Sequence, residues 1–341
     1  MTGWHYAIAG TAVGAALMLG LAQGATAADK TYTIYLSNNF VGNDWRQQML
    51  RSANVAVTKP PLAGRVNLKV EVVETTVQAQ INSLNNIIRA KPDAILVDAG
   101  SSDALNPTLK KACDAGIVVV SFDGIVTEPC AYRVVVDFEA MGKEEVEQMA
   151  KFQPKGGNLL EIRGLAGTSI DEAIHKGIQE GVAAHPEFKI VNTVTGDWDQ
   201  TTAQKAVATV LPSLPDVVGI VDQGGDGYGA AQAFAAGGKP RPTIIMGNRQ
   251  DELQWWKEQK AKDGYTTWSA SIAPGVSTLA FWVAQQVLDG HKDIPHDLLV
   301  PYLAFTQDNF EAELPNIAQG GVASHEYTLD EAQAAIKANM K

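Results

Sequence analysis

Charge is missing from the start of this chain. The first 28 residues contain no Lys, Arg, Asp or Glu. Residues 7–21 form an apolar or small run, about as long as the hydrophobic region of a signal peptide and too short for a bilayer span. Ala25, Thr26 and Ala27 then supply the small residues that a signal peptidase accepts. We therefore expect residues 1–27 to be a cleaved signal peptide, with a buried N-terminal helix as the alternative.

Further apolar runs, clustered cysteines and an excess of positive charge are missing as well. No later stretch approaches the length of a membrane span, so we expect the mature protein to be soluble. The net charge of -11 argues against nucleic-acid or anionic-membrane partners. The two cysteines, Cys113 and Cys130, form no CxxC or Cys/His cluster. In an exported protein we expect them to form a disulfide, which contributes about 3 kcal/mol; two buried thiols are the alternative.

Signatures of catalysis and of nucleotide cofactors are also absent. The stretch Gly224–Gly229 has neither GxGxxG spacing nor a Walker lysine, and no G-x-S-x-G surrounds Gly167–Ser169. His291 and His296 have the wrong spacing for metal ligands on one helix face. We therefore predict that the protein is not an enzyme and needs no cofactor or metal.

Short β-rich runs alternate with helical stretches along the rest of the chain. One series has strands at 31–37, 66–75, 93–97 and 117–122, and a second series runs from 134 to 246. Nearly continuous apolar strands are typical of parallel sheets that helices cover on both faces. The expected fold class is therefore α/β, with two doubly wound parallel-sheet lobes and a ligand cleft between them.

Carboxylates, amides and indoles recur directly after the predicted strands, where such sheets bind ligands. Asp and Asn hydrogen-bond hydroxyl groups, and Trp can lie against the C–H face of a sugar ring, so this combination indicates a neutral polyhydroxylated ligand. The candidates at these positions are Asn38, Asn43, Asp44, Trp45, Arg46, Asp98, Asp123, Trp198, Asp226 and Asn248. Helix capping remains the alternative for Asp44, Asp123 and Asp226, and surface packing for the two tryptophans. Trp255 and Trp256 lie inside a predicted helix and are interpreted as core.

Several segments resemble the periplasmic sugar-binding proteins of ABC importers, known as type I periplasmic binding proteins. They are KPDAILV (91–97), GSSD (100–103), AGIVVVSFD (115–123), GLAGTS (164–169), GDWD (196–199) and DGYGA (226–230). NDWR (43–46) resembles a segment of galactofuranose-binding proteins in which Trp and Arg contact the sugar. The resemblance implies that Trp45 and Arg46 lie in the cleft and that Asp123 binds ring hydroxyls. It also implies that Trp198 forms a stacking wall and that Asn248 contributes from the far lobe.

Two departures from the family pattern argue against ribose itself as the ligand. Glu172 stands where the family often has an Arg that reaches the ligand, and Asp226 follows a glycine where an Asn-Asp pair is common. The resemblance also implies three crossings between lobes, near 136–138, 269–272 and 300–303. The first lobe then comprises 28–136 plus 271–301, and the second 137–270 plus 302–341, with a C-terminal helix at 327–340 on the second. Asp137 and Ser271, at two crossings, complete the candidate ligand-binding residues together with Glu172.

The resemblance implies a monomeric binding protein of a Gram-negative periplasm. It would capture a small neutral sugar or polyol by hinge closure and deliver the ligand to an ABC permease. A sensory binding protein of the same fold, which feeds a chemoreceptor or sensor kinase, is the alternative. A sugar-responsive transcription regulator would need a helix-turn-helix ahead of Thr31, for which the expected leader leaves no room.

Overall fold

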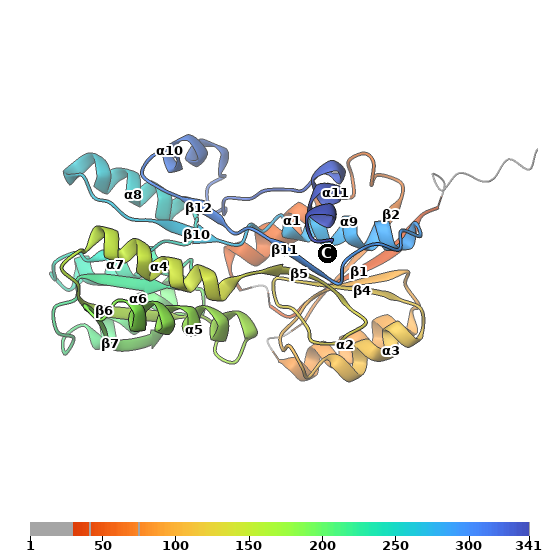
Figure 1. Cartoon of the computed structure of the whole chain (residues 1–341), viewed down its shortest axis with the longest axis horizontal. Coiled ribbons are helices and arrows are strands. Elements are labelled where there is room, and N and C mark those ends of the chain that lie inside the picture. The colour runs from red at the N-terminus through yellow and green to blue at the C-terminus, as the bar shows by residue number, and fades with distance from the viewer. Residues whose placement is uncertain (1–29, 41, 74–75, 341) are drawn as a thin grey trace, which may run out of the picture. The chain divides into compact units, whose positions relative to one another are not determined.

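A parallel sheet of six strands organises the first lobe, in the order β11-β5-β4-β3-β1-β2 (Figure 1). The structure, a computed structural model, describes residues 30–40, 42–73 and 76–340, so the predicted signal peptide lies outside the described residues. The strands are β1 (Tyr32–Asn38), β2 (Val66–Val72), β3 (Ala94–Asp98), β4 (Val118–Phe122), β5 (Tyr132–Val136) and β11 (Asp297–Val300). The helices of this lobe are α1 (Asp44–Ala56), α2 (Val77–Arg89), α3 (Asn106–Asp114) and α9 (Val276–Leu288).

The second lobe contains a four-stranded parallel sheet in the order β7-β6-β8-β9, with a small antiparallel pair, β10-β12, beside it. The strands are β6 (Gly157–Arg163), β7 (Phe188–Thr195), β8 (Gly219–Asp222), β9 (Thr243–Ile244), β10 (Ser269–Ser271) and β12 (Leu303–Phe305). The helices are α4 (Phe138–Phe152), α5 (Ser169–Ala184), α6 (Gln200–Val210), α7 (Gly227–Ala236), α8 (Gln250–Asp263), α10 (Phe310–Glu313) and the 3-10 turn η2 (Leu314–Asn316).

Alternating side chains of each strand supply two different cores. In β3, Leu96 packs into the core under α1 and α9, whereas Ile95 and Val97 pack into the core under α2 and α3. A strand buried on both faces needs the continuous apolar run seen in the sequence, so the predicted doubly wound arrangement is confirmed. Among the described residues, no helix is long and apolar enough to cross a membrane.

The C-terminal helix α11 (Leu329–Ala338) packs on the first lobe, so its predicted place on the second lobe is wrong. Ala332 and Ile336 are buried in the core that α9 also lines, and the indole of Trp282 in α9 donates to the carbonyl of Tyr327 at 2.7 Å. Figure 1 shows α11 beside α9 and β11. The chain therefore returns to the first lobe after residue 321, and it crosses between the lobes four times instead of three.

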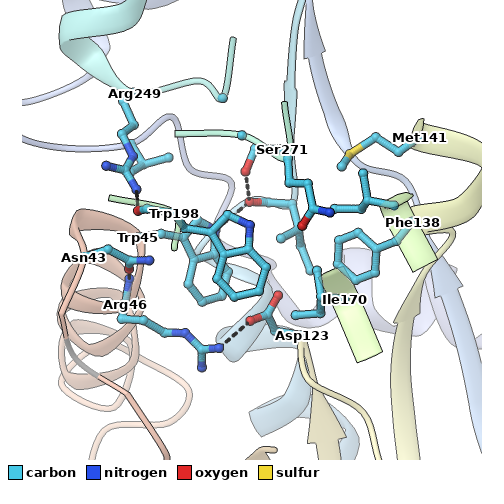
Figure 2. Close-up of a pocket in the computed structure, with 16 residues that line it drawn as sticks. Asn43, Trp45, Arg46, Asp123, Phe138, Met141, Ile170, Trp198, Arg249 and Ser271 are labelled. Carbon is cyan, nitrogen blue, oxygen red and sulfur yellow. Dashed lines mark hydrogen bonds and ion pairs between the residues drawn. The ribbon is translucent and has the colours of Figure 1, made fainter. Parts of the chain in front are cut away.

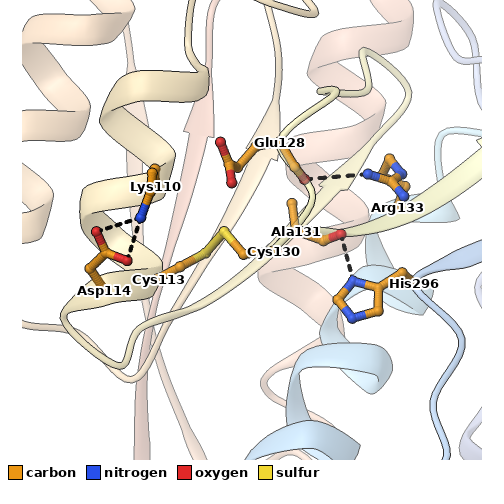
Figure 3. Close-up of a disulfide and its surroundings, with 8 residues drawn as sticks. All are labelled: Lys110, Cys113, Asp114, Glu128, Cys130, Ala131, Arg133 and His296. Carbon is orange, nitrogen blue, oxygen red and sulfur yellow. Dashed lines mark hydrogen bonds and ion pairs between the residues drawn. A yellow bond between two sulfur atoms is a disulfide. The ribbon is translucent and has the colours of Figure 1, made fainter.

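The two cysteines form a disulfide, as predicted. Cys113 lies in the last turn of α3, and Cys130 lies just before β5, with their Cα atoms 6.4 Å apart (Figure 3). A turn in which the N–H of Ala131 donates to the carbonyl of Glu128 brings the chain back to this helix end. The bond fixes the outer part of the first lobe.

Trp256 belongs to the core under α8, which confirms its interpretation, and Trp255 is partly buried and packs against that core. The Trp256 ring is fully buried and stacks on Phe310 of α10, with ring centroids 4.0 Å apart. Trp255 meets Tyr265 edge to face. The stacking of Trp256 on Phe310 attaches the segment after β12 to the second lobe.

Candidate functional site

Three strand ends of the first lobe meet at one guanidinium. The register of β1 and β3 places Asn38 directly beside Asp98, and Asp123 follows the end of the next strand, β4. Arg46, in the first turn of α1, donates to Asn38 Oδ1 at 3.0 Å, forms an ion pair with Asp98, and lies 3.1 Å from Asp123 Oδ2. The helix begins at this point because the Asn43 side chain accepts from the backbone N–H of Arg46 at 2.9 Å.

The buried position of Arg46 and Asp123 shifts the pKa values of both groups. Arg46 and Asp123 are each about 5–6% exposed. Loss of water raises the pKa of Asp123, and the neighbouring Arg46 charge opposes that rise. The same desolvation lowers the pKa of Arg46, against the attraction of Asp123. Each charge therefore offsets part of the cost of burying the other.

Trp45 connects α1 to a crossing segment. Trp45 is 8% exposed. Its indole N–H donates at 2.7 Å to the carbonyl of Ile272, which lies in the segment that joins β10 to α9. The Arg46 guanidinium lies over the ring, 5.4 Å from its centroid. Trp45 therefore packs and lines the pocket at the same time, so the packing and ligand interpretations are compatible for this residue.

Trp198 approaches the site from the second lobe, after β7. Asp197 and Trp198 both have positive φ, 57° and 54°, which is unusual for residues with side chains and marks a locally strained turn. The indole lies so close to Gly164 that a Cβ there would be 2.1 Å from the ring. Glycine at 164 is thus what allows this ring position. Arg249, at the start of α8, donates to the carbonyl of Trp198 at 2.6 Å and holds the turn.

These groups surround a pocket lined by residues of both lobes (Figure 2). The pocket has a cavity volume of about 60 Å³, which is room for a few waters. A volume of this size suits a compact ligand rather than an oligosaccharide. The lining residues are Asn43, Trp45, Arg46, Asp123, Phe138, Met141, Ile170, Ile174, Trp198, Gln223, Gly224, Gly247, Arg249, Ser271, Ile272 and Val322.

The structure brings six of the predicted ligand-binding residues to this pocket: Asn43, Trp45, Arg46, Asp123, Trp198 and Ser271. Asn38 and Asp98 lie behind Arg46 and orient it. Asp44 is not a lining residue, and its carboxylate lies 3.8 Å from the Arg249 guanidinium of the other lobe. Asn43, rather than Asp44, supplies the helix cap.

The remaining four predicted residues have other surroundings. Asp137 caps α4 by accepting from the N–H of Ala140 at 2.8 Å. Glu172 is exposed and paired with Arg163 at 2.7 Å. Asn248, with φ at 67°, bonds Ser269 and the carbonyl of Leu303, which places it at the base of two crossing segments.

Asp226 is the fourth, and neither alternative considered for it describes its side chain. The residue is fully buried at the start of α7, makes no side-chain cap bond, and does not line the pocket. Both carboxylate oxygens are buried without a hydrogen-bond partner. Burial raises the pKa of Asp226 well above its usual range, although the nearby Arg249 charge opposes the shift.

The sequence-based site lacked the apolar half of the lining and two polar members. The apolar members come from the first two turns of α4 and α5, where apolar residues are usually interpreted as core. They are Phe138, Met141, Ile170 and Ile174. Their spacing, including the i, i+4 pair at 170 and 174, is the same in a buried helix face. Gln223 and Arg249 follow strands, and that position was a usable signal for both. Among the described residues, no cluster of three or more His, Cys, Asp or Glu side chains is placed to bind a metal.

Comparison with known sequences identifies relatives of this chain. A family model described as a periplasmic binding protein domain matches residues 34–292. The xylitol-binding protein of Mycolicibacterium smegmatis is 25% identical over 264 residues, which cover 75% of this chain and 73% of that protein. The ribose import binding protein of Salmonella typhimurium is 27% identical over 201 residues, 58% of this chain and 66% of that protein.

Comparison with solved structures confirms the predicted fold class. An ABC transporter solute binding protein from Thermobispora bispora superposes with a TM-score of 0.84 and 31% identity, over 90% of this chain and 95% of that chain. A solute binding protein from Mycobacterium smegmatis with bound glycerol gives a TM-score of 0.76 over 86% of this chain and 100% of that chain. At 21% identity the second likeness shows the fold alone.

Proposed function

Because this chain belongs to the family of periplasmic binding protein domains, we propose that it captures one small neutral sugar or polyol and delivers it to the permease of an ABC importer. The observation that carries the proposal is the pocket between the lobes, where the Trp45 and Trp198 indoles accompany the paired Arg46 and Asp123. Indoles suit the C–H faces of a polyol, and the charged pair suits its hydroxyls. The relatives are named as binding proteins, and this chain is likewise a binding protein and not an enzyme.

Neutrality of the ligand follows from the charges around the pocket. Two cations line it, and each has a carboxylate nearby: Arg46 has Asp98 and Asp123, and Arg249 has Asp44 at 3.8 Å. Burying an anion without a compensating charge costs several kcal/mol. The compensated cations therefore favour hydroxyl oxygens over a ligand carboxylate.

Binding is expected to close the cleft, because a ligand held by both lobes favours the closed state by what it gains from the second lobe. Export through a signal peptide at 1–27, residence in a Gram-negative periplasm and action as a monomer belong to the same proposal. Export is supported by the charge-free N-terminal segment, and a periplasmic location by the family. No observation on the described residues favours the sensory alternative, so it is not proposed.

A thermal-shift screen of the mature protein tests the proposal. The panel contains neutral pentoses, hexoses, furanose-forming sugars and polyols of four to six carbons, with sugar acids and amino acids as comparison classes. A ligand that binds the folded state raises the melting temperature. At a ligand concentration about 100 times Kd, the folded state is stabilised by roughly 2.7 kcal/mol. We expect a shift with at least one neutral sugar or polyol. Shifts confined to the sugar acids or amino acids contradict the proposal.

A further inference from the structure

The pocket has two chemically different sides. Phe138 and Met141 on α4, with Ile170 and Ile174 on α5, form one side, which we call the apolar wall. In Figure 2, Phe138, Met141 and Ile170 lie on one side and Asn43, Arg46 and Arg249 lie on the other, with the two labelled indoles between them. Every side chain of the wall is at most 9% exposed.

Close packing of α4 against α5 keeps the wall in place. A Cβ on Gly142 of α4 would lie 2.3 Å from the carbonyl oxygen of Ile174 on α5, so the two backbones touch at this point. Such contact leaves little freedom for either helix to move, because protein interiors are packed as densely as organic crystals. The apolar wall is therefore a fixed feature of the pocket.

Hydrogen-bonding side chains line the rest of the pocket. None of the four wall side chains carries a hydroxyl, amide or charged group. Gln223, which also lines the pocket, is already occupied, since its oxygen accepts from the N–H of Gly164 at 3.0 Å and its amide donates to the carbonyl of Asp171 at 2.9 Å. Ser271 donates to the carbonyl of Ile272 at 3.1 Å. Among the lining side chains, donors for ligand hydroxyls remain on Arg46, Arg249, the Asn43 amide and the Trp198 indole.

A hydroxyl directed at the wall would lose its water without gaining a partner, which is unfavourable. A methyl group in the same place would be buried against four apolar side chains, which is favourable. The ligand edge that faces the wall therefore carries carbon and hydrogen, while its hydroxyls face the arginine side.

We propose that the preferred ligand is a sugar or polyol with a terminal methyl group in place of a hydroxymethyl group, that is, a terminally deoxygenated monosaccharide or alditol. The inference rests on the proposed function and specifies the class of ligand within it. The methyl end lies against the apolar wall, and the hydroxyls bind Arg46, Asp123 and Arg249.

Calorimetric titration with pairs of sugars that differ only at the terminal carbon tests the inference. The pairs are D-galactose with D-fucose, L-galactose with L-fucose, L-mannose with L-rhamnose, and D-glucose with D-quinovose; the best binders of the thermal-shift panel are titrated beside them. We expect the deoxy member of the best-bound pair to bind about tenfold or more tightly than its hydroxylated partner and to exceed every fully hydroxylated compound. Preference for a fully hydroxylated sugar or polyol overturns the inference but leaves the proposed function standing. Absence of binding by every neutral compound contradicts both.

A matched pair of substitutions on α5 locates the preference at the wall. Ile170→Thr places a hydroxyl in the wall and removes apolar carbon from it, and we expect it to reduce the deoxy-to-hydroxy affinity ratio at least threefold. Ile178→Thr makes the same change at a buried position of the same helix, outside the pocket. It is expected to leave the ratio unchanged. An unchanged ratio in a folded Ile170→Thr protein, or an equal change in both variants, contradicts the placement of the methyl end.

Discussion

Arg46 joins the ends of three neighbouring strands, and its surroundings explain why this position requires an arginine. Its guanidinium is buried and contacts Asn38, Asp98 and Asp123. A planar fork can serve several acceptors at once, whereas a lysine ammonium is a single point with different reach. Replacement by lysine would leave a buried carboxylate poorly paired, which is costly in a site with little water.

Arg46→Lys is accordingly expected to weaken binding of the best panel compound at least tenfold, or about 1.4 kcal/mol. Calorimetric titration measures the affinity. Arg65→Lys is the matched control, because Arg65 pairs with Asp289 at 2.9 Å in the same lobe without lining the pocket. Equal affinity of the two lysine variants would show that Arg46 is not a ligand-binding group.

Gly164 determines where the Trp198 indole can lie. An added methyl would overlap the ring, so Gly164→Ala is expected to displace the indole and weaken binding by about 1 kcal/mol. The double variant Gly164→Ala with Trp198→Ala should bind no more weakly than Trp198→Ala alone, because both changes remove the same contact. Additive losses of affinity in this cycle would mean that the glycine acts on something other than the indole.

Most polar side chains of the site could be predicted from the sequence, whereas the apolar side chains could not. Trp45, Arg46 and Asp123 follow strands of a parallel sheet, where the topology gathers side chains at one edge. Ile170 and Ile174 have the spacing of an ordinary core face, and only the packing of α4 on α5 shows that they border a cavity. Asp226 also follows a strand, yet its side chain is buried away from the pocket.

At the scale of elements, α11 differs most from expectation. A helix was expected at 327–340, but the surface against which an amphipathic helix packs cannot be determined from its own residues. The apolar face settles on α9 and β11, where Ile336 is 6% exposed. The side-chain amide of Asn339 also pairs with the N–H and carbonyl of Leu299 in β11, so the helix covers part of an edge strand.

Ile336→Ala should therefore destabilise the first lobe by about 2–5 kcal/mol, as expected for a buried isoleucine. Urea unfolding measures the loss. Lys337→Ala on the exposed side of the same helix serves as control and should cost less than about 0.5 kcal/mol. Similar losses in both variants would contradict the packing of α11 on this lobe. Ligand affinity of the folded variants should not change, since α11 does not line the pocket.

At the scale of the whole molecule, several buried carboxylates lie in the second lobe. Burial, reinforced by Asp226 and Glu252, raises the pKa of Asp222 well above its usual range. Burial also raises the pKa of Glu252 from 4.5 to about 7, against the opposing charge of Arg249. The carboxylate of Glu252 accepts from the backbone N–H groups of Gly227, Gly247 and Arg249, which ties two loops to the start of α8.

The free energy of unfolding is expected to fall as the pH rises from about 4.5 through 7. A carboxyl with a raised folded pKa binds more protons in the folded state over this window, so its stabilising contribution is complete below the unfolded pKa and is lost above the folded one. The contribution of Glu252 is on the order of 3 kcal/mol. Urea unfolding at pH 5 and pH 8 measures the slope, and Glu252→Gln should make it shallower. Stability that rises over this window would contradict the prediction.

The two lobes are connected by four crossings, and the pocket draws its lining from both lobes and from those crossings. Trp45 and Asp123 belong to the first lobe, Trp198 and Arg249 to the second, while Ile272 and Val322 lie on crossing segments. The ion pair between Asp44 and Arg249 at 3.8 Å also spans the lobes. A ligand in this pocket would contact both lobes and the crossing segments. We therefore predict that ligand binding and hinge closure occur together.

Calorimetric titration of the wild type, Trp45→Ala and Asp123→Ala with the best neutral sugar or polyol is the most direct test of this account. We predict one binding site per chain in the wild type. Each substitution should weaken binding by at least about 2 kcal/mol, because it removes a stacking surface or one of the two carboxylates that pair with Arg46. Wild-type affinity in both folded variants, or heat of binding with none of the neutral compounds, would contradict capture of a sugar or polyol in this pocket.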